Sequence, residues 1–527
     1  DSVIRTLVEA IPEALWADIE IIGWLYQFYI AEKKDEVIGK VVKSEDIPAA
    51  TQLFTPNWIV KYMVQNSLGA TWLATYPASP LKSQLEFYIE PAEQTPEVQA
   101  QLAAITPDSL DPEALTLIDP ASGSGHILVE AYDLFKAIYL ERGYRQRDIP
   151  ELILTKNLFG LDICPRAAQL TGFALLMKGR ADDRRLLDRD RGIRLNVMPL
   201  VNSTDLDVER LASGVDLAAY GLDRADLQQL ADLFEHATTF GSLIQVPPVL
   251  AEKLPALARL AAATSDDLFV AEDLKRLEPL VRQAEVLSKQ YDAVVENPPY
   301  LGGKLFCNEL RGFVGQTYEV AKADLYGAFV LRNMEFAVAR GRVGMITTPN
   351  WLSISSFKEL RKTILRDMPI ASLVDNGRGV WGSDFGSCSF VLQQTPLPEA
   401  AGSYLRLYDK PGSVAGNDEL KRRFFANPRF KRSSADFAKI PGCPIAYWLG
   451  KKTADLFVTE EAMGKRLTAT VGLQTCDNTR FLRFWTEVSY RGVGFGCQST
   501  AEAAETEKRW FPYNKGGVFR KWYGNNE

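Results

Sequence analysis

The chain has 527 residues, of which 46% are hydrophobic and 24% charged, and its formal net charge is −7. This composition is typical of a globular protein, and the length predicts two to four domains. With 60 basic and 67 acidic side chains, the chain lacks the positive excess of a protein that covers nucleic acid with its whole surface, although a local basic face would be enough to contact phosphates.

The cysteines form no CxxC pair, and the histidines are His126 and His236. This pattern predicts reduced, intracellular thiols and argues against a disulfide framework, a zinc site or a metal site built from several histidines. We find no signal peptide and no apolar run long enough to span a membrane, so we expect a cytoplasmic protein. The first residue is Asp1 rather than Met and no clear element closes the chain, which suggests a fragment of something longer.

Helical periodicity dominates residues 1–50, where apolar side chains recur every three or four positions and predict a helical N-terminal region. Pro48 interrupts this pattern. A second amphipathic helix is expected to begin near Thr55-Pro56, because proline is favoured in the first turn of a helix. Residues 76–112 are rich in proline, glutamine and small side chains, which predicts short helices and loops.

From residue 115 onward the chain alternates between short apolar runs and helical segments. Strands that alternate with helices predict a parallel, doubly wound α/β sheet. Residues 206–288 carry Leu, Ala, Asp and Arg at helical spacing, so we expect a helical insertion between the third and the fourth strand. The runs that predict strands are 115–119, 158–162, 195–201, 292–296, 342–347, 372–375 and 389–393.

After residue 400 the alternation weakens, and residues 401–470 predict a linker or helical connector. Two stretches, 421–432 and 508–523, interleave basic with aromatic side chains. Both could follow a DNA backbone. For the first stretch, a solvated surface with buried aromatic rings fits the pattern equally well, whereas we favour DNA contact for the second.

A glycine-rich loop, Asp-Pro-Ala-Ser-Gly-Ser-Gly at residues 119–125, follows the first predicted strand and leads into a helix. Glycines allow a tight turn and the close approach of a ligand that a Cβ atom would exclude. The same geometry can hold a dinucleotide, and a plain strand-to-helix turn would use the same residues. The loop alone is therefore a weak signal.

Asp162 ends the second predicted strand, within Gly-Leu-Asp-Ile at residues 160–163. An acid at this place commonly accepts hydrogen bonds from ribose hydroxyls, and Ile163 could flank an adenine ring. The alternative is an aspartate that caps the following helix. Because a glycine-rich loop precedes it, we favour the ligand-binding interpretation.

The segment Asn297-Pro298-Pro299-Tyr300 directly follows a buried strand. Prolines fix φ and lack N–H donors, which makes the loop stiff and turns its carbonyls outward. The Asn297 amide oxygen and the Pro298 carbonyl could both accept from one exocyclic amino group, and Tyr300 could stack on the base that carries it. Fixed acceptors favour the charge that builds on an aryl amine as it attacks a sulfonium methyl group, so we expect these four residues to be catalytic. A proline-rich turn is the structural alternative.

The order of these motifs, with Phe54-Thr55-Pro56 ahead of the glycine loop, resembles the DNA amino-methyltransferases that use S-adenosylmethionine (SAM) and carry a target-recognition domain after the catalytic domain. The resemblance implies a Rossmann-like α/β SAM-dependent methyltransferase fold over residues 51–400, with a mixed, mostly parallel sheet. It implies SAM as the cofactor, no metal, and double-stranded DNA with a flipped adenine as the substrate. The cofactor-binding residues that it implies are Thr55, Pro56, Asp119, Ala121, Gly123, Gly125, Asp162, Ile163, Asp205 and Asn297.

The same resemblance implies roles for single residues. In that family an acid after the third strand contacts the SAM adenine, and Asp205 fits it. Aromatic side chains stack on the flipped base, a role implied for Tyr300 and Phe385. Residues 324–326, Asp-Leu-Tyr, match the helix beside the cofactor pocket. For His126, contact with the SAM carboxylate and a plain structural role stand at even odds.

A closer resemblance is to PglX, the family of adenine-specific methyltransferases in bacterial BREX phage-defence systems. It rests on Glu-Ile-Ile-Gly-Trp-Leu-Tyr-Gln (20–27), Gln-Leu-Phe-Thr-Pro (52–56) and Trp-Phe-Pro-Tyr-Asn-Lys-Gly-Gly (510–517). This resemblance implies methylation of adenine N6 at specific DNA sites, other BREX proteins as partners and a bacterial cytoplasmic location. It also implies that residues 471–527 begin the target-recognition domain.

Other functions are consistent with the motifs. Enzymes that methylate a glutamine amide, or a guanine amino group in RNA, also use Asn-Pro-Pro-Tyr but are usually much shorter chains. A type IIG-like restriction-modification enzyme is a further alternative, although no nuclease motif is evident. From a different class, the chain could be a SAM-binding DNA-recognition subunit of a defence complex with little turnover. Cytosine C5 methylation is disfavoured, because neither Cys307 nor Cys388 forms the Pro-Cys pair needed for covalent attack.

Overall fold

The chain divides into two compact units, residues 1–459 and 460–527. The computed structural model describes residues 5, 9, 10, 12, 20–37, 40–188, 192–382, 385–468 and 474–513. In the second unit the described elements are short: η11 (Met463–Lys465), α22 (Asn478–Phe481), η12 (Trp485–Glu487), η13 (Tyr490–Gly492) and α23 (Thr500–Glu505). Residues 514–523 of the second basic-aromatic stretch lie outside the described residues, and the assignment of 471–527 to a target-recognition domain stays a prediction.

The first unit is built on a sheet with the strand order β3-β2-β1-β4-β5-β7-β6-β8-β9. The pairs β1-β2, β2-β3, β1-β4, β4-β5 and β6-β8 are parallel, and β7 runs antiparallel between β5 and β6. The first seven strands, with the antiparallel seventh inserted before the sixth, have the order of the SAM-dependent methyltransferase fold, which confirms the predicted fold class. The strands are β1 (Leu117–Asp119), β2 (Leu158–Asp162), β3 (Asn196–Pro199), β4 (Tyr291–Glu296), β5 (Ala337–Thr347), β6 (Ile370–Arg378), β7 (Gly386–Gln393), β8 (Ala401–Arg406) and β9 (Arg429–Ser433).

Each of the seven predicted runs coincides with one of the first seven strands. The last two strands were not predicted: β8 and β9 lie within residues 401–470, where we expected a linker or helical connector. The sheet therefore continues to residue 433. The reason is visible in β9, whose sequence Arg-Phe-Lys-Arg-Ser is charged and alternates between exposed and half-buried positions before the buried Ser433. Charged side chains are common on edge strands, and they remove the apolar run from which a strand is recognised.

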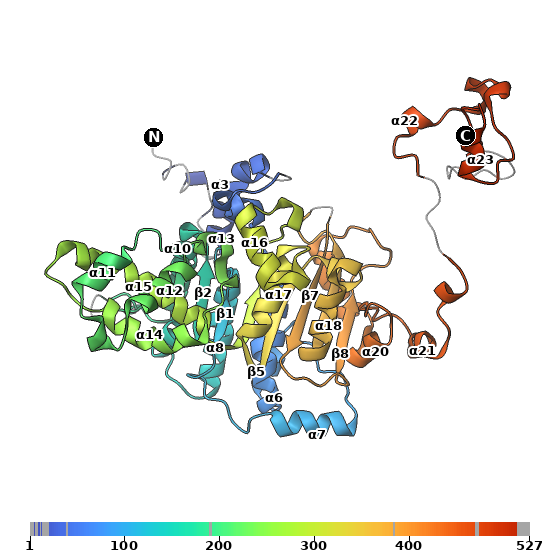
Figure 1. Ribbon diagram of the computed structural model, residues 1–527. Helices are drawn as coiled ribbons and strands as arrows, with labels where there is room; N and C mark the ends of the chain where they lie inside the picture. The colour runs from blue at the N-terminus through green and yellow to red at the C-terminus, as the bar shows by residue number, and fades with distance from the viewer. Residues whose placement is uncertain are drawn as a thin grey trace. The chain divides into compact units, whose positions relative to one another are not determined.

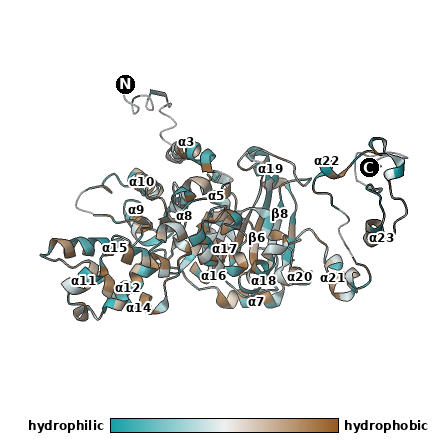
Figure 2. Cartoon of the chain, turned by 45° about the horizontal axis from the view of Figure 1, so that its top comes forward, coloured by the Kyte–Doolittle hydropathy of each residue, from teal (hydrophilic) through white to brown (hydrophobic). Residues whose placement is uncertain are grey.

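Helices cover both faces of the sheet, because successive strand residues point to opposite sides. Val294 of β4 belongs to the core under α15, α17 and α18. Its neighbours Ala293 and Val295 belong to a second core under α5, α8 and α19. Figure 2 shows hydrophobic residues gathered where these helices meet the sheet.

The described α-helices of the first unit are α3 (Glu20–Val37), α4 (Ile47–Thr51), α5 (Asn57–Val64), α6 (Ala70–Thr75), α7 (Pro96–Ile105), α8 (His126–Glu141), α9 (Ile149–Leu152), α10 (Pro165–Asp182), α11 (Val208–Gly214), α12 (Arg224–Leu233), α13 (Ala237–Phe240), α14 (Pro248–Ala261), α15 (Leu268–Ser288), α16 (Asn308–Thr317), α17 (Leu325–Phe336), α18 (Lys358–Asp367), α19 (Asn417–Ala426), α20 (Ser434–Ala438) and α21 (Lys451–Thr459). A π-helical turn, η2 (Gln65–Gly69), joins α5 to α6. In the described part of the chain, no helix combines the length and the apolar character needed to cross a membrane.

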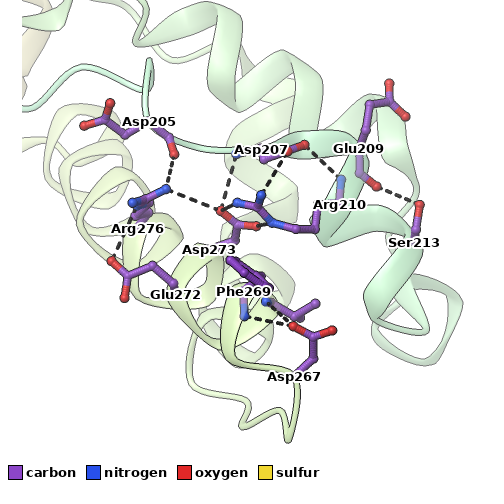
Figure 3. Close-up of polar contacts among 11 residues, drawn as sticks. Asp205, Asp207, Glu209, Arg210, Ser213, Asp267, Phe269, Glu272, Asp273 and Arg276 are labelled. Atoms are coloured by element: carbon purple, nitrogen blue, oxygen red, sulfur yellow. Dashed lines mark hydrogen bonds and ion pairs between the residues drawn. The ribbon is translucent and has the colours of Figure 1, made fainter.

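The predicted helical insertion is confirmed, since residues 206–288 form α11 to α15 between β3 and β4. A buried carboxylate ties its two ends together: Asp273 of α15 is fully buried and accepts from Arg210 of α11, at 2.6 Å from Nε and 2.8 Å from Nη2 (Figure 3). Such a bidentate partner compensates the cost of burying the charge. The insertion is thus a packed subdomain, and its first and last helices contact each other.

Candidate active site

A cavity of about 130 Å³ opens at the carboxyl ends of β1, β2 and β4. This is the place where an open α/β sheet binds its ligand, at the point where the strand order reverses. Its described lining includes residues 51–55, 119–124, 162–163, 239–243 and Asn297. The motifs that lie far apart in the sequence therefore meet in one cavity.

The glycine loop owes its shape to two left-handed residues, Gly123 at φ +54° and Gly125 at φ +89°. A Cβ atom on Gly125 would lie 2.9 Å from Cγ2 of Thr171, so this position requires glycine. Thr171 also donates to the Gly123 carbonyl at 2.9 Å. Asp119, at 1% exposure, accepts from the Ala121 amide at 3.2 Å. Burial raises the pKa of Asp119 well above its ordinary value.

Asp162 braces this loop from the next strand. Its Oδ2 accepts from the Gly123 amide at 2.8 Å and its Oδ1 from the Cys164 amide at 2.7 Å. Burial raises its pKa to about 6. Each carboxylate oxygen keeps a second lone pair for a ligand. Asp162 thus braces the glycine loop and the turn before α10 rather than serving as the N-cap residue of that helix, and its contact with ribose stays a prediction.

Asn297 joins the Thr55 loop to the Asn-Pro-Pro-Tyr segment. Its Nδ2 donates to the Leu53 carbonyl and to Thr55 Oγ1, both at 2.9 Å. The Tyr300 hydroxyl lies 2.6 Å from Asn297 Oδ1 and 2.9 Å from the Ile346 carbonyl. With both amide hydrogens engaged, the amide cannot turn over, and its oxygen is held as the acceptor. Burial raises the pKa of Tyr300 well above its ordinary value, so its hydroxyl stays a donor.

Three aromatic rings form a wall beside Asn297. Tyr300 lies 5.8 Å from Trp381 and 6.4 Å from Phe385, and Trp381 lies 5.1 Å from Phe385, measured between ring centroids. Phe385 is 41% exposed, so its ring is available for stacking. The structure thus brings Phe385 to Tyr300, as the resemblance implied.

Trp381 was not predicted as a site residue from the sequence. Its Nε1 donates to the Phe54 carbonyl at 2.8 Å, which ties the wall to the Thr55 loop. The available signal was an aromatic residue between glycines, Gly-Val-Trp-Gly, in the loop that leads to Phe385.

The predicted cofactor residues do not all line the cavity. Pro56 and Gly125 are not among the residues that line the cavity. They are the residues immediately before α5 and α8. Asp205 is placed elsewhere: it is exposed, and its carbonyl accepts from Arg276 Nη1 of α15 at 2.7 Å. Figure 3 shows its carboxylate pointing away from Asp273. The expected contact between Asp205 and the SAM adenine is therefore wrong for this conformation.

The insertion supplies the wall that Asp205 was expected to form. After β3 the chain turns into α11, and it returns to the cavity through α13 and residues 239–243. Asn202 Oδ1 accepts from the Thr238 amide at 2.9 Å, and Ser242 Oγ donates to the Pro120 carbonyl at 2.7 Å. No local motif marks these residues, which is why the sequence did not reveal them.

His126 and Asp324 brace the site. The His126 ring lies 3.8 Å from the Phe54 ring, and its Nδ1 is 3.0 Å from Ser124 Oγ. Burial lowers the His126 pKa to about 3, so the imidazole is neutral and cannot act as a cation toward a carboxylate. Asp324 accepts from the Leu301 amide at 3.1 Å and thereby holds the end of the Asn-Pro-Pro-Tyr segment; burial raises its pKa to about 6.

Glu296, immediately before Asn297, is fully buried. Its Oε2 accepts from Asn333 Nδ2 of α17. Burial, with Asp119 nearby, raises its pKa well above the ordinary value. Burial therefore favours the protonated form of the Glu296 carboxyl group, directly before the Asn-Pro-Pro-Tyr segment.

Known proteins match this chain along its whole length. A family model described as Eco57I restriction-modification methylase matches residues 156–381. The chain is 45% identical to "Adenine-specific methyltransferase BrxX" of Escherichia coli O9:H4 (strain HS), over 100% of this chain and 45% of that protein. It is 35% identical to "Adenine-specific methyltransferase PglX" of Lacticaseibacillus casei (strain Zhang), over 99% of this chain and 45% of that protein. The chain thus spans less than half the length of these curated relatives.

Among solved structures, similarity extends to a nuclease-deletion mutant of the Type ISP restriction-modification enzyme LlaGI in complex with a DNA substrate mimic. The TM-score is 0.43 and the identity 13%, over 79% of this chain and 29% of that one.

Proposed function

The chain is a homologue of the adenine-specific methyltransferases BrxX and PglX, and from this premise we propose that it forms the catalytic part of an enzyme that transfers a methyl group from SAM to N6 of adenine in double-stranded DNA. The target adenine leaves the duplex to reach the cavity. The modification serves BREX phage defence, together with other BREX proteins. The observation that carries this proposal is the Asn297 amide, which hydrogen bonds to Leu53, Thr55 and Tyr300 fix in the lining of the cavity that contains the glycine loop.

The cavity suits SAM in its own chemistry. A Cβ atom on Gly123 would meet its nearest atom, Gln52 Nε2, at 3.8 Å, so the loop leaves room above its backbone. Ser122 Oγ and His126 Nε2 are buried and have no partner among the described residues, and both belong to the lining. Such groups are ready to bind the polar parts of a ligand.

We assign the parts of the cofactor to residues as follows. Thr55 and the glycine loop hold the methionine end, and Asp162 accepts from the ribose. Ile163 and residues 239–243 enclose the adenine; a Cβ atom on Gly241 would lie 3.3 Å from Ile163 Cγ2, so these two walls are in contact. When bound, SAM supplies a methyl group that is electrophilic because it sits on a sulfonium.

The residues of the chain then orient the nucleophile. Asn297 Oδ1 and the Pro298 carbonyl accept the two hydrogens of the exocyclic amino group, which favours positive charge on that nitrogen. Tyr300, Trp381 and Phe385 offer ring faces to the flipped base. Because Asn297 is fixed by its neighbours before substrate arrives, little reorganisation is needed at the moment of transfer.

The test is methyl transfer from tritiated SAM to DNA by the full-length protein with its partners. Asn297→Ala is expected to lower kcat at least about 10²-fold, since a fixed acceptor is lost. SAM affinity, measured by calorimetry, is expected to change by less than about threefold. Asn427→Ala is the matched control, because this amide binds the Arg406 carbonyl outside the cavity.

Equal transfer by the wild type and Asn297→Ala would contradict the proposal. SAM binding without any transfer would instead favour the SAM-binding recognition subunit. A long-read methylation map of cells with and without the gene would report the base and its sequence context together.

A further inference from the structure

A second cavity, of about 170 Å³, opens at the opposite edge of the sheet. Its walls come from the starts of β6 and β8, the end of the antiparallel β7, and the helices α6 and α7. Figure 1 shows α6 and α7 at the lower end of the sheet, whereas α3 and α13, which contribute to the candidate active site, lie at the upper end. Among the described lining residues, none is shared by the two cavities.

Arg342 brings a positive charge into this cavity. It lies in β5, between Ala293 of β4 and Gln393 of β7. Burial lowers its pKa only to about 10, so the guanidinium is protonated at neutral pH. Within the described part of the chain it has no hydrogen bond or ion pair, and no Asp or Glu is among the described residues of the lining. Arg342 is half-buried, and a partly desolvated charge without a partner costs free energy that a bound anion would offset.

Two arginines of the described chain that are more deeply buried have partners. Arg332 donates to the carbonyls of Ser242, Ile244 and Leu287 and to the Glu335 carboxylate at 3.1 Å. Arg361 donates to the carbonyls of Trp351, Ile354, Gly442 and Cys443. The fold therefore supplies acceptors to these two guanidinium groups and leaves that of Arg342 open.

Two hydroxyl groups that line the same cavity also lack hydrogen-bond partners within the described chain. Thr395 Oγ1 is buried and has no partner among the described residues. Tyr88 interacts electrostatically with Arg342, and its hydroxyl makes no hydrogen bond within the described chain. Burial raises the Tyr88 pKa, so this group remains a donor. By contrast, the neighbouring Asn66 and Gln94 amides bind backbone groups through both their nitrogen and their oxygen atoms.

The rest of the lining is largely apolar and includes Ala74, Ile89, Ile370 and Leu397. One cation with two hydroxyl donors in an apolar cavity is the pattern of a small-molecule site, and a guanidinium matches a carboxylate or a phosphate with two parallel hydrogen bonds. We propose that this cavity binds a small molecule that carries one carboxylate or phosphate group on an apolar body. Arg342 and Tyr88 hold the anionic group, Thr395 donates to it, and the aliphatic residues cover the body.

The test is calorimetric titration of the full-length protein, in phosphate-free buffer, with three probes that share one ring: benzoate, phenyl phosphate and benzamide. At least one of the two anions is expected to bind saturably at millimolar concentration, and neutral benzamide is expected not to bind. A preference for benzoate assigns the site to carboxylates, and a preference for phenyl phosphate assigns it to phosphates. If neither anion binds, or if benzamide binds equally well, the proposal is overturned.

Variants identify the cavity as the place of binding. Arg342→Met is expected to weaken the preferred anion about tenfold or more. Without ligand, it is expected to raise Tm by about 2 °C, because a half-buried charge without a partner in the described chain is removed. Arg366→Gln is the matched control, since this exposed arginine of α18 pairs with Asp367 and should leave binding unchanged. Unchanged affinity in a folded Arg342→Met protein would overturn the proposal.

If Arg342→Met does not fold, a second variant decides. Tyr88→Phe combined with Thr395→Val removes two hydroxyl donors and keeps the cation. Affinity for the preferred anion is expected to fall about fivefold or more, and unchanged affinity in this variant overturns the proposal. SAM binding in the same sample reports separately on the candidate active site.

Discussion

Particular side chains at the two edges of the sheet differ in how they are hydrogen-bonded. At the carboxyl edge, Asn297, Asp162 and Thr55 each hold a neighbouring loop through hydrogen bonds of 2.7–2.9 Å. At the opposite edge, Arg342 and Thr395 Oγ1 have no such partner within the described chain. The first edge is therefore organised before any ligand arrives, whereas the second keeps its donors available. Two kinds of substitution test this difference: those that remove a tight contact at the carboxyl edge, and those that remove a side chain without a hydrogen-bond partner at the opposite edge.

Among substitutions at the carboxyl edge, Gly125→Ala is expected to have the largest effect on the free energy of unfolding. The alanine would adopt φ near +89° and meet the backbone of Thr171, with Cα at 3.0 Å. Left-handed strain and overpacking together cost about 2–3 kcal/mol in the free energy of unfolding. Urea denaturation measures this as a lower midpoint at unchanged slope.

Gly221 provides the matched control, since its φ is +72° and a Cβ atom there meets nothing within 4 Å. Gly221→Ala therefore isolates the backbone strain and is expected to cost about 1 kcal/mol. If both variants lost the same stability, the packing of Thr171 against the glycine loop would impose no constraint.

Trp381→Ala is expected to have the next largest effect, on the proposed methyl transfer. Loss of a stacking face costs about 1–2 kcal/mol, so kcat/KM for DNA should fall about 5- to 30-fold while SAM affinity is retained. Trp381→Phe keeps a ring but loses the hydrogen bond to the Phe54 carbonyl, and it separates stacking from loop anchoring. A fall in SAM affinity equal to the fall in kcat/KM would assign Trp381 to the cofactor side instead.

The carboxyl edge could largely be predicted from the sequence, because each of its motifs is local. The glycine loop, Asp162 and Asn297 each follow a buried strand directly, and parallel strands bring their carboxyl ends to one edge. Residues 239–243 and Trp381 could not be predicted in the same way. They reach the cavity through the packing of the insertion and of a loop after β6, and no short pattern encodes that packing.

The same reasoning explains the failures. Asp205 was expected at the cofactor because it follows β3, yet the backbone there is held by Arg276 of the insertion. β9 carries the charge of an edge strand rather than an apolar run. The second cavity joins residues from 66 to 401, and each of them alone looks like an ordinary strand or loop residue.

Glu296→Gln is expected to change the pH dependence of stability. The folded pKa of Glu296 is raised by burial, so the neutral acid stabilises the fold below its unfolded pKa, and this contribution is lost as pH rises toward the folded value. Glutamine is isosteric and cannot ionise. The variant should therefore be more stable than the wild type by on the order of 1 kcal/mol at pH 8, and nearly equal at pH 4.

Chemical denaturation at both pH values measures this difference. In the variant, the free energy of unfolding should depend less on pH than in the wild type. The dependence should not vanish, because burial also raises the pKa of Asp119. A variant that is less stable at pH 8 than at pH 4, relative to the wild type, would show that Glu296 is ionised in the folded protein.

The smallest effects come from a pair of Thr→Val substitutions, one at each edge. Thr55 and Thr395 are equally buried, each at 6% exposure, and valine matches the shape of threonine. Thr55→Val leaves one Asn297 amide hydrogen without its acceptor and is expected to cost about 1 kcal/mol. Thr395→Val removes a hydroxyl that has no partner in the described chain and is expected to gain up to about 0.5 kcal/mol in the ligand-free protein. If urea denaturation shows that Thr55→Val lowers the free energy of unfolding and Thr395→Val raises it, the contrast between the two edges is supported. A loss at both would mean that Thr395 already has a partner in solution, which would leave only Arg342 and Tyr88 available to a ligand.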